Sequence, residues 1–122
     1  MHAKNPTSNL ERLFHEPNRL AMLSALASSG EEGLSFGELR VLCGLTDGNL
    51  SRHLTALEEE GIVCVEKTFV DRKPRTTITP TRKGLDRFAA YLATLERVLV
   101  DARASLPARH RAQITALRRA TV

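Results

Sequence analysis

The sequence predicts an α+β fold that is mainly α-helical and contains a small β-hairpin. Apolar residues recur with helical spacing through most of the chain, and two runs rich in β-branched residues flank a short basic segment. A final apolar pattern continues without interruption from residue 81 to residue 105. The chain has 122 residues, of which 42% are hydrophobic and 26% are charged. This length and composition fit one folded domain and are too hydrophobic for a disordered chain.

The N-terminal part is predicted to contain two helices. Apolar residues within 10–14 predict a short opening helix, which stops before Pro17 because proline disfavours helix in the residue that precedes it. Pro17 itself suits the first turn of a new helix. Leu20 and Leu23 follow with the spacing of a buried helical face, and this helix is expected to end near Gly30.

A helix-turn-helix is predicted next. Ser35 followed by Glu38 has the capping-box pattern that begins a helix. Gly44 is placed to end that helix in a left-handed conformation, and Thr46 is a new N-cap for a helix over 47–60. Two helices joined by a three-residue turn that contains glycine have the arrangement of a helix-turn-helix.

The second half of the chain is predicted to form a hairpin and two further helices. The strands are expected over 62–69 and 76–79, with 70–75 as a basic loop between them. Thr81 caps a long helix that runs to residue 105, and 108–120 is expected to form a short, marginal helix.

The predicted elements follow the order helix, helix, turn, helix, two-stranded hairpin and helix. This is the order of a winged helix-turn-helix, which here carries a long C-terminal dimerisation helix. We therefore divide the chain into a winged helix-turn-helix DNA-binding domain over 10–80, a dimerisation helix over 81–106 and a basic C-terminal segment over 107–122.

Several motifs resemble those of the small winged-helix DNA-binding transcriptional regulators related to MarR and ArsR. The resemblance is carried by 44–54, 57–61, 65–77 and 79–84, and it extends over about residues 10–99. It implies that the helix over 46–60 enters the major groove of double-stranded DNA and that the hairpin, or wing, touches the neighbouring backbone.

The polar face of the helix over 47–60 independently fits this role. At 100° per residue, with its leucines facing the core, one arc points outward and carries side chains able to read bases, since Arg can read guanine and Asn adenine. The predicted DNA-contacting residues, including the basic residues of the wing and of the following helix, are Thr46, Gly48, Asn49, Ser51, Arg52, Thr55, Lys67, Arg72, Lys73, Arg75, Arg82 and Lys83.

Charge is concentrated around the predicted wing. The net charge of the whole chain is +4, whereas 67–83 alone carries +5, which favours a polyanionic partner. For the wing and for Arg82 and Lys83, contact with phosphate stands beside the alternative of ordinary solvated charges. Glutamates over 58–60 would repel phosphate, so this end of the helix should point away from DNA.

The long helix is predicted to pair with a second copy of the chain. Its apolar residues alternate in spacings of three and four, the pattern of a coiled-coil seam. The alternative is packing against the opening helix and the C-terminal tail. The predicted interface consists of Leu85, Phe88, Leu92, Leu95, Leu99 and Leu106.

Other classes of function have little support in the sequence. It contains no glycine-rich phosphate loop and none of the hydrolase or metalloprotease motifs, so we expect neither an enzyme nor a cofactor. Cys43 and Cys64 lack metal-ligand spacing and are expected to be buried or half-buried thiols, and His53 is expected to pack at the edge of the core rather than bind metal. A protein-contact module and a metal- or redox-responsive regulator remain as alternatives.

We also expect a cytoplasmic protein without a membrane segment, because no apolar run approaches the roughly 20 residues of a transmembrane helix. The sequence identifies no small-molecule effector.

Overall fold

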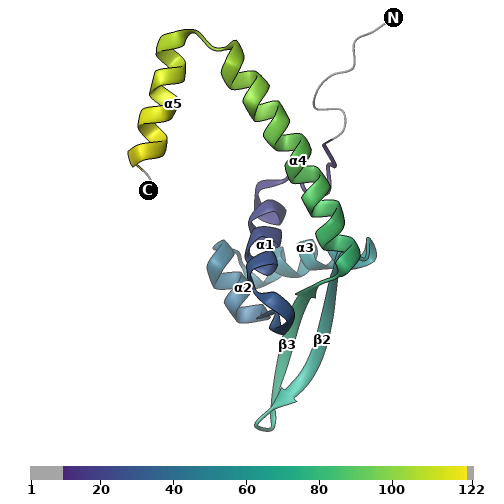
Figure 1. Ribbon diagram of the computed structural model, residues 1–122. Helices are drawn as coiled ribbons and strands as arrows, with labels where there is room; N and C mark the ends of the chain where they lie inside the picture. Colours follow the sequence, from purple (N-terminus) through teal and green to yellow (C-terminus); the bar gives the residue numbers. More distant parts are fainter. Residues whose placement is uncertain (1–9, 121–122) are drawn as a thin grey trace, which may run out of the picture.

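A cluster of three helices and a three-stranded antiparallel sheet form one end of the molecule, and a long helix leads away from them (Figure 1). The computed structural model describes residues 10–120. In chain order the elements are α1 (Pro17–Ser28), the 3-10 turn η1 (Gly30–Glu32), β1 (Leu34–Ser35), α2 (Phe36–Cys43), α3 (Asp47–Glu59), β2 (Val63–Val70), β3 (Lys73–Pro80), α4 (Arg82–Ser105) and α5 (Ala108–Ala120). The predicted winged helix-turn-helix with a long C-terminal helix is confirmed.

Local capping explains where the first helices begin and end. The Glu16 side chain accepts a hydrogen bond from the Arg19 N–H at the start of α1, where Pro17 occupies the first position. Ser35 and Glu38 form the predicted capping box of α2, and Gly44 ends α2 in the left-handed conformation, with φ of 63°. Because these signals act over only three or four residues, they could be predicted from the sequence.

The opening segment is a turn rather than the predicted helix. The N–H groups of Phe14 and His15 both reach the carbonyl of Glu11, and the chain then enters α1 at Pro17. Pro17 disfavours helix in the residue before it, so the turn is not continued into α1 as one helix. Leu10 and Phe14 of this segment are both buried in the core.

The hairpin is longer and its turn tighter than predicted. Both strands have eight residues, and the ladder continues to a final pair between Val70 and Lys73, so β3 begins at Lys73 instead of residue 76. The turn consists of Asp71 and Arg72, with φ of 52° and 67°. Two consecutive residues with positive φ suit a two-residue turn whose twist matches the strands. The usual Asn-Gly signal for such a turn is absent, which explains the missed register.

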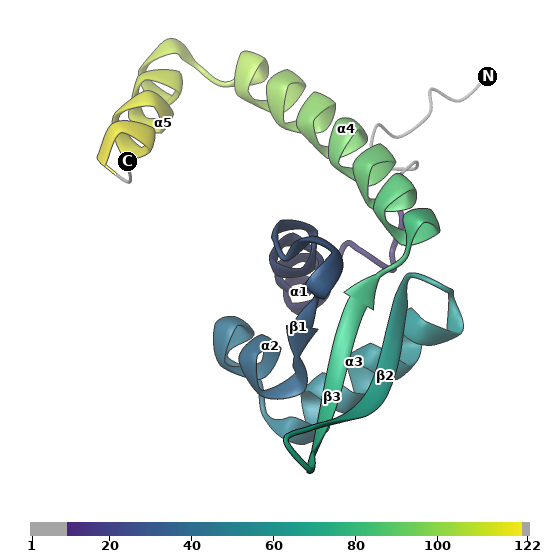
Figure 2. The same ribbon diagram turned by 60° about the horizontal axis from the view of Figure 1, so that its bottom comes forward.

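The sheet has the order β1-β3-β2, and the sequence analysis missed β1. Leu34 and Ser35 pair with Ile78 and Thr77 of β3. This strand is too short to show alternation, and Ser35 also serves as the N-cap of α2. In Figure 2, β1 lies between α1 and β3 and thus joins the helical cluster to the sheet.

One hydrophobic core connects the helices, the sheet and the first half of α4. Phe14, Phe88 and Tyr91 form an aromatic group within it, with the rings of Phe14 and Phe88 edge to face at 5.5 Å between centroids. Beyond the middle of α4 the burial stops, and every residue from 99 to 109 is exposed. The remaining buried residues of this core are Leu10, Met22, Leu23, Leu26, Leu39, Leu50, Leu54, Leu57, Ile62, Val63 and Ile78.

The start of α4 is fixed against the start of β2. The Thr81 hydroxyl donates to the carbonyls of Gly61 and Ile62 and accepts from the Gly84 N–H. A side chain at Gly84 would collide with the carbonyl of Ile62, so only glycine permits this approach. Within residues 10–120, no helix is long and apolar enough to cross a membrane.

Candidate nucleic-acid interface

Helix α3 is held in place by its buried leucines and by contacts at its N-terminus. Leu50, Leu54 and Leu57 are buried in the core. Thr46 accepts a hydrogen bond from the Asn49 N–H, and Asp47 forms an ion pair with Arg40 of α2 at 3.2 Å. The carboxylate of Asp47 also lies in the first turn, where the helix dipole favours negative charge. The outer face of α3 is thus presented on a fixed support.

The outer face of α3 carries the polar arc that the sequence analysis identified. Thr46, Gly48, Asn49, Ser51, Arg52 and Thr55 are all exposed. Within this arc, Arg52 Nη2 donates a hydrogen bond to Asn49 Oδ1 at 2.9 Å. The two side chains with the most specific base-reading chemistry therefore lie together on one turn of the helix.

Strand β2 runs back along α3 and leaves a hollow of about 370 Å³ between the helix and the hairpin. Lys67, an expected DNA-contacting residue of the wing, lies in its wall together with Ser51 and Thr55 of α3. The outer arc of α3 and one face of the hairpin thus form a continuous surface, which we call the α3–wing surface. The whole lining consists of Phe36, Ser51, Leu54, Thr55, Glu58, Val65, Lys67 and Thr76.

The wing tip brings two further cations to the end of this surface. Arg72 occupies the turn itself, Lys73 follows it, and both are exposed. Arg75 differs from them, because its Nη2 is 3.2 Å from Glu38 Oε1 of α2. The pKa of Glu38 is lowered, first by a hydrogen bond with the Ser35 side chain, then by one with the Ser35 backbone and by the charge of Arg75. These contacts keep the Glu38 carboxylate ionised. Arg75 is thus partly neutralised, whereas Arg72 and Lys73 form no ion pair with any residue between 10 and 120.

Arg82 and Lys83 lie away from the α3–wing surface. Both are exposed at the start of α4, beside the first pair of the hairpin, which joins Val63 to Pro80. The last turn of α3, with its exposed glutamates over 58–60, lies at the same end, but Glu58 also lines the hollow of the α3–wing surface, contrary to the expectation that all three glutamates point away from it. The structure therefore separates these two cations from the wing tip by the full length of the hairpin.

The predicted alternatives based on metal or thiol chemistry depend on His53, Cys43 and Cys64. His53 is half-buried, and its Nδ1 is 3.8 Å from Glu16 Oε2, which agrees with a packed histidine. Burial raises the pKa of the Cys43 thiol, so it is less reactive. Cys64 is exposed, which contradicts the expectation that both thiols are at least half-buried. Among residues 10–120 there is no group of three or more potential metal ligands.

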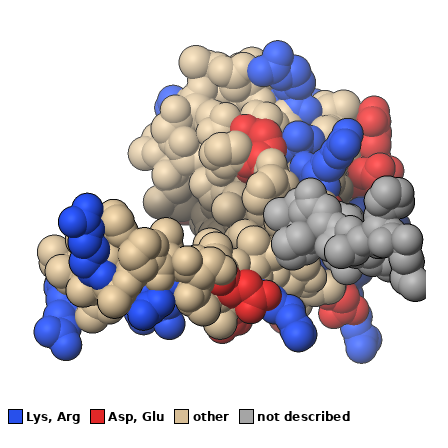
Figure 3. Space-filling view, turned by 90° about the horizontal axis from the view of Figure 1, so that it is seen from above, with Lys and Arg blue, Asp and Glu red and all other residues tan. Residues whose placement is uncertain are grey.

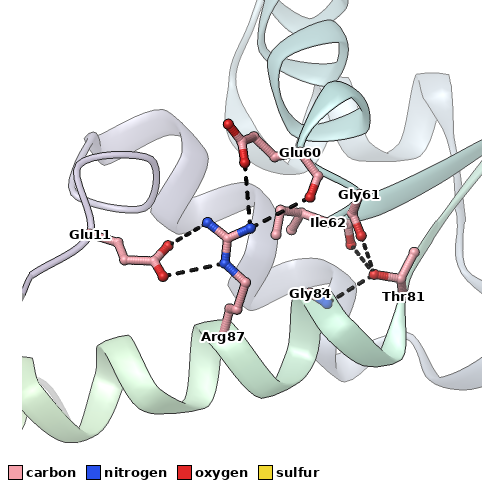
Figure 4. A network of polar contacts seen from close by, with 7 residues as sticks. All are labelled: Glu11, Glu60, Gly61, Ile62, Thr81, Gly84 and Arg87. Atoms are coloured by element: carbon pink, nitrogen blue, oxygen red, sulfur yellow. Dashed lines mark hydrogen bonds and ion pairs between the residues drawn. The ribbon is translucent and has the colours of Figure 1, made fainter.

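Arg87 is a central residue that the sequence analysis did not identify (Figure 4). Its guanidinium binds both carboxylate oxygens of Glu11, at 2.9 and 3.3 Å, and also contacts the carboxylate and the carbonyl of Glu60 at 3.5 Å. The hydrogen bonds with Glu11, together with both acidic charges, raise the pKa of Arg87. This network joins the opening turn, the end of α3 and the first half of α4.

The predicted dimer seam of α4 separates into two faces. Phe88 is only 4% exposed and belongs to the core of its own chain, and Leu95 also packs against that core. Phe88 is therefore a correction to the predicted interface, because a helix that starts on the core must direct one apolar stripe inward, whereas the partly buried Leu95 stays a prediction. The outward stripe, with a spacing of seven residues and every member exposed, is Leu85, Leu92, Leu99 and Leu106.

The C-terminal helix α5 turns back toward α4 and leaves the stripe exposed. A hollow of about 440 Å³ between the two helices is lined by Leu99, Val100 and Ile114, among others. Figure 3, a view of the side opposite the hairpin, shows basic side chains projecting from α5 at the left. The helix contains four arginines and no acidic residue between Ala108 and Ala120.

Comparison with known proteins identifies the fold. Residues 18–99 match the winged helix DNA-binding domain family, and this segment includes α3, the hairpin and the first half of α4. The chain belongs to this family. A related uncharacterized protein of Methanocaldococcus jannaschii is 36% identical over 81 residues, which cover 66% of the winged helix chain and 86% of the relative.

Solved structures agree with this assignment. A transcriptional regulator homologue of Pyrococcus horikoshii is 28% identical, with a TM-score of 0.67, and the match covers 80% of this winged helix chain and 92% of the homologue. MarR gives a TM-score of 0.67 at 22% identity over 87% and 74% of the two chains. MepR of Staphylococcus aureus in complex with DNA gives 0.65 at 17% identity over 93% and 86%. The predicted resemblance to MarR-type regulators is confirmed at the level of the fold.

Proposed function

We propose that this chain is a sequence-specific regulator of transcription that binds double-stranded DNA as a homodimer. In this proposal α3 enters the major groove, and the wing contacts the backbone beside it. The observation that carries the proposal is the α3–wing surface. On it, the hydrogen-bonded side chains of Asn49 and Arg52 lie beside a hairpin that has basic residues at its tip. Bases are read by such polar side chains, and phosphates are bound by such cations.

The family and the structural relatives support the same function. The matched family is described as a DNA-binding domain, and MepR, which shares the fold, has been solved on DNA. The competing proposal, a winged helix used only for protein contact, would not need an exposed arc of base-reading side chains.

Homodimer formation is supported by the outward stripe of α4. Leu85, Leu92 and Leu99 recur every seven residues along the 24 residues of α4, and Leu106 is the extended residue that follows its end. One exposed leucine needs no explanation, but a row of them at one heptad position favours pairing with another helix. A twofold dimer would place two copies of α3 on half-sites about one turn of DNA apart, so the binding site should be a pseudo-palindrome.

Selection from a pool of random duplexes tests the proposal. We expect the full chain to enrich one pseudo-palindromic sequence and to bind it on the order of a thousandfold or more tightly than a shuffled duplex of equal length and composition. Both affinities should be measured at low and at moderate salt, because nonspecific binding weakens steeply as salt rises. Equal affinity for the two duplexes at both salt concentrations, with no enriched sequence, would contradict the proposal.

A further inference from the structure

Phe69 is the most exposed large apolar side chain that the structure describes. It is 76% exposed and lies near the end of β2, one position before Val70 and two before the turn. Burying an aromatic ring of this kind is strongly favourable, so a ring held in water at the tip of a wing calls for an explanation.

The register of the hairpin places Phe69 on the side that faces α3. In an antiparallel pair, directly opposed residues point to the same face, and every second residue along a strand returns to it. Val65 is opposite Ile78, and both contact the core. Two residues further along, Lys67 is opposite Thr76, and both line the hollow beside α3.

The next pair on this face joins Phe69 to Pro74. At 3.3 Å per residue, Phe69 lies about 7 Å beyond Lys67 along the strand, toward the tip. The apolar pair is therefore the outer end of the α3–wing surface. Val70 belongs to the opposite face of the same hairpin.

The chemistry around this pair indicates what it contacts. Lys67 lies on the same face and Arg72 occupies the turn beside it, and both are exposed cations, as is Lys73, which pairs with Val70 on the opposite face. An apolar protein partner would be a poor match for so many charges. The minor groove of DNA is a good match, because it has phosphates along both edges and apolar sugar and base surfaces between them, and because proteins insert Phe or Pro between its base steps.

We propose that Phe69, supported by Pro74, enters the minor groove next to the segment read by α3 and partly unstacks one base step. The chain would then select a deformable step at a position where no side chain forms a hydrogen bond with a base. This inference rests on the proposed DNA-binding function and adds a residue that determines specificity through DNA shape.

The test uses the duplex selected by the full chain. The fluorescent base 2-aminopurine replaces one base at a time at each base step beside the segment that α3 contacts. Its fluorescence should rise on binding at one step, because unstacking relieves quenching. Phe69→Ala should abolish that rise and weaken binding roughly tenfold, while the slope of log affinity against log salt stays the same because no charge is removed. Phe69→Leu should retain most of both effects, since leucine also serves as an apolar wedge.

Val70→Ala is the matched control, since Val70 is an apolar, 49% exposed neighbour on the other face. It should leave both the affinity and the fluorescence unchanged. The inference is overturned if Phe69→Ala binds like the unmodified chain, if affinity falls while the fluorescence rise persists, or if Val70→Ala has the same effects. Failure of the unmodified chain to prefer any duplex would be a different outcome, and it would overturn the proposed function itself.

Discussion

Asn49 and Arg52 combine two properties that base reading requires, exposure and fixed geometry. Their hydrogen bond of 2.9 Å holds both side chains over one turn of α3 before any DNA is present. Because rotamer freedom is already reduced, less conformational entropy is lost when Arg52 binds a base. Binding would still have to redirect the Arg52 guanidinium from Asn49 to the base edge.

Arg52→Ala should weaken binding to the selected duplex by roughly 1 to 3 kcal/mol and broaden the base preference at one position of each half-site, since a bidentate contact is lost. Titrations with the selected duplex and its single-base variants measure both effects. Arg109→Ala on α5 is the control, because it removes the same charged group from the helix furthest from the wing. Unchanged affinity and preference in Arg52→Ala would exclude Arg52 from the base-reading set.

Residue-level predictions succeeded where the partner is close in the sequence. Ser35 with Glu38, and Thr46 with the Asn49 N–H, are capping contacts that span three residues. The partners of Arg87 are 76 and 27 positions away, so nothing in its local sequence distinguishes it from other arginines of α4. The exposure of Phe69 was also missed, although its alternation with Lys67 could have revealed the shared face.

Among the elements, the hairpin departs most from what the sequence predicts. The helices show their bounds through caps and apolar periodicity, whereas the strands depend on pairing across the turn. Asp71 is a residue type that tolerates positive φ, whereas Arg72 rarely adopts it, and pairing along eight residues overrides that preference. The consequence is a longer wing, with Arg72 at its very tip.

Replacing Arg72 and Lys73 together by Ala should weaken binding to all duplexes by similar factors. Each lost phosphate contact should reduce the slope of log affinity against log salt by about 0.9. Arg75→Ala should have a smaller effect on binding to DNA, because Arg75 already pairs with Glu38. Its effect on stability should also be small, since a surface pair of this kind contributes about 0 to 1 kcal/mol. Titrations at four or more salt concentrations give the slopes.

Arg82→Ala and Lys83→Ala separate the two basic groups. If phosphate contact is confined to the α3–wing surface, neither replacement should change the slope of log affinity against log salt. A change as large as that caused by replacing Arg72 and Lys73 would show that the interface extends to the start of α4. A slope unaffected by the Arg72 and Lys73 replacements would show that the wing tip does not bind DNA.

At the scale of the whole molecule, α4 serves two purposes with two faces. Phe88, Tyr91 and Leu95 complete the core of their own chain, while the outward stripe faces water. The prediction from heptad spacing treated both faces of α4 as one seam. Periodicity identifies the apolar positions of a helix but not the surface that each of them covers. Leu99 also lines the hollow beside α5, yet at 59% it is the most exposed member of that stripe.

Leu92→Glu combined with Leu99→Glu should abolish homodimers, because both residues are exposed, at 41% and 59%, and a buried unpaired carboxylate is costly at an interface. Sedimentation equilibrium at tens of micromolar should give a dimer for the unmodified chain and a folded monomer for the variant. The control, Val41→Glu with Leu42→Glu, places the same charges on exposed apolar positions of α2 and should remain dimeric. A monomeric unmodified chain, or a variant that still dimerises, would exclude the outward stripe as the interface.

The core that is complete within a single chain affects how steeply occupancy of DNA would depend on the concentration of the protein. Phe88 and Tyr91 are buried without a second copy, so a chain that folds before it assembles would make assembly a separate equilibrium governed by mass action. With the proposed dimer as the binding species, occupancy of a palindromic site at low concentration rises with the square of the monomer concentration. A twofold change in synthesis would then alter occupancy about fourfold, so the rate at which the chain is made would itself act as a regulatory input.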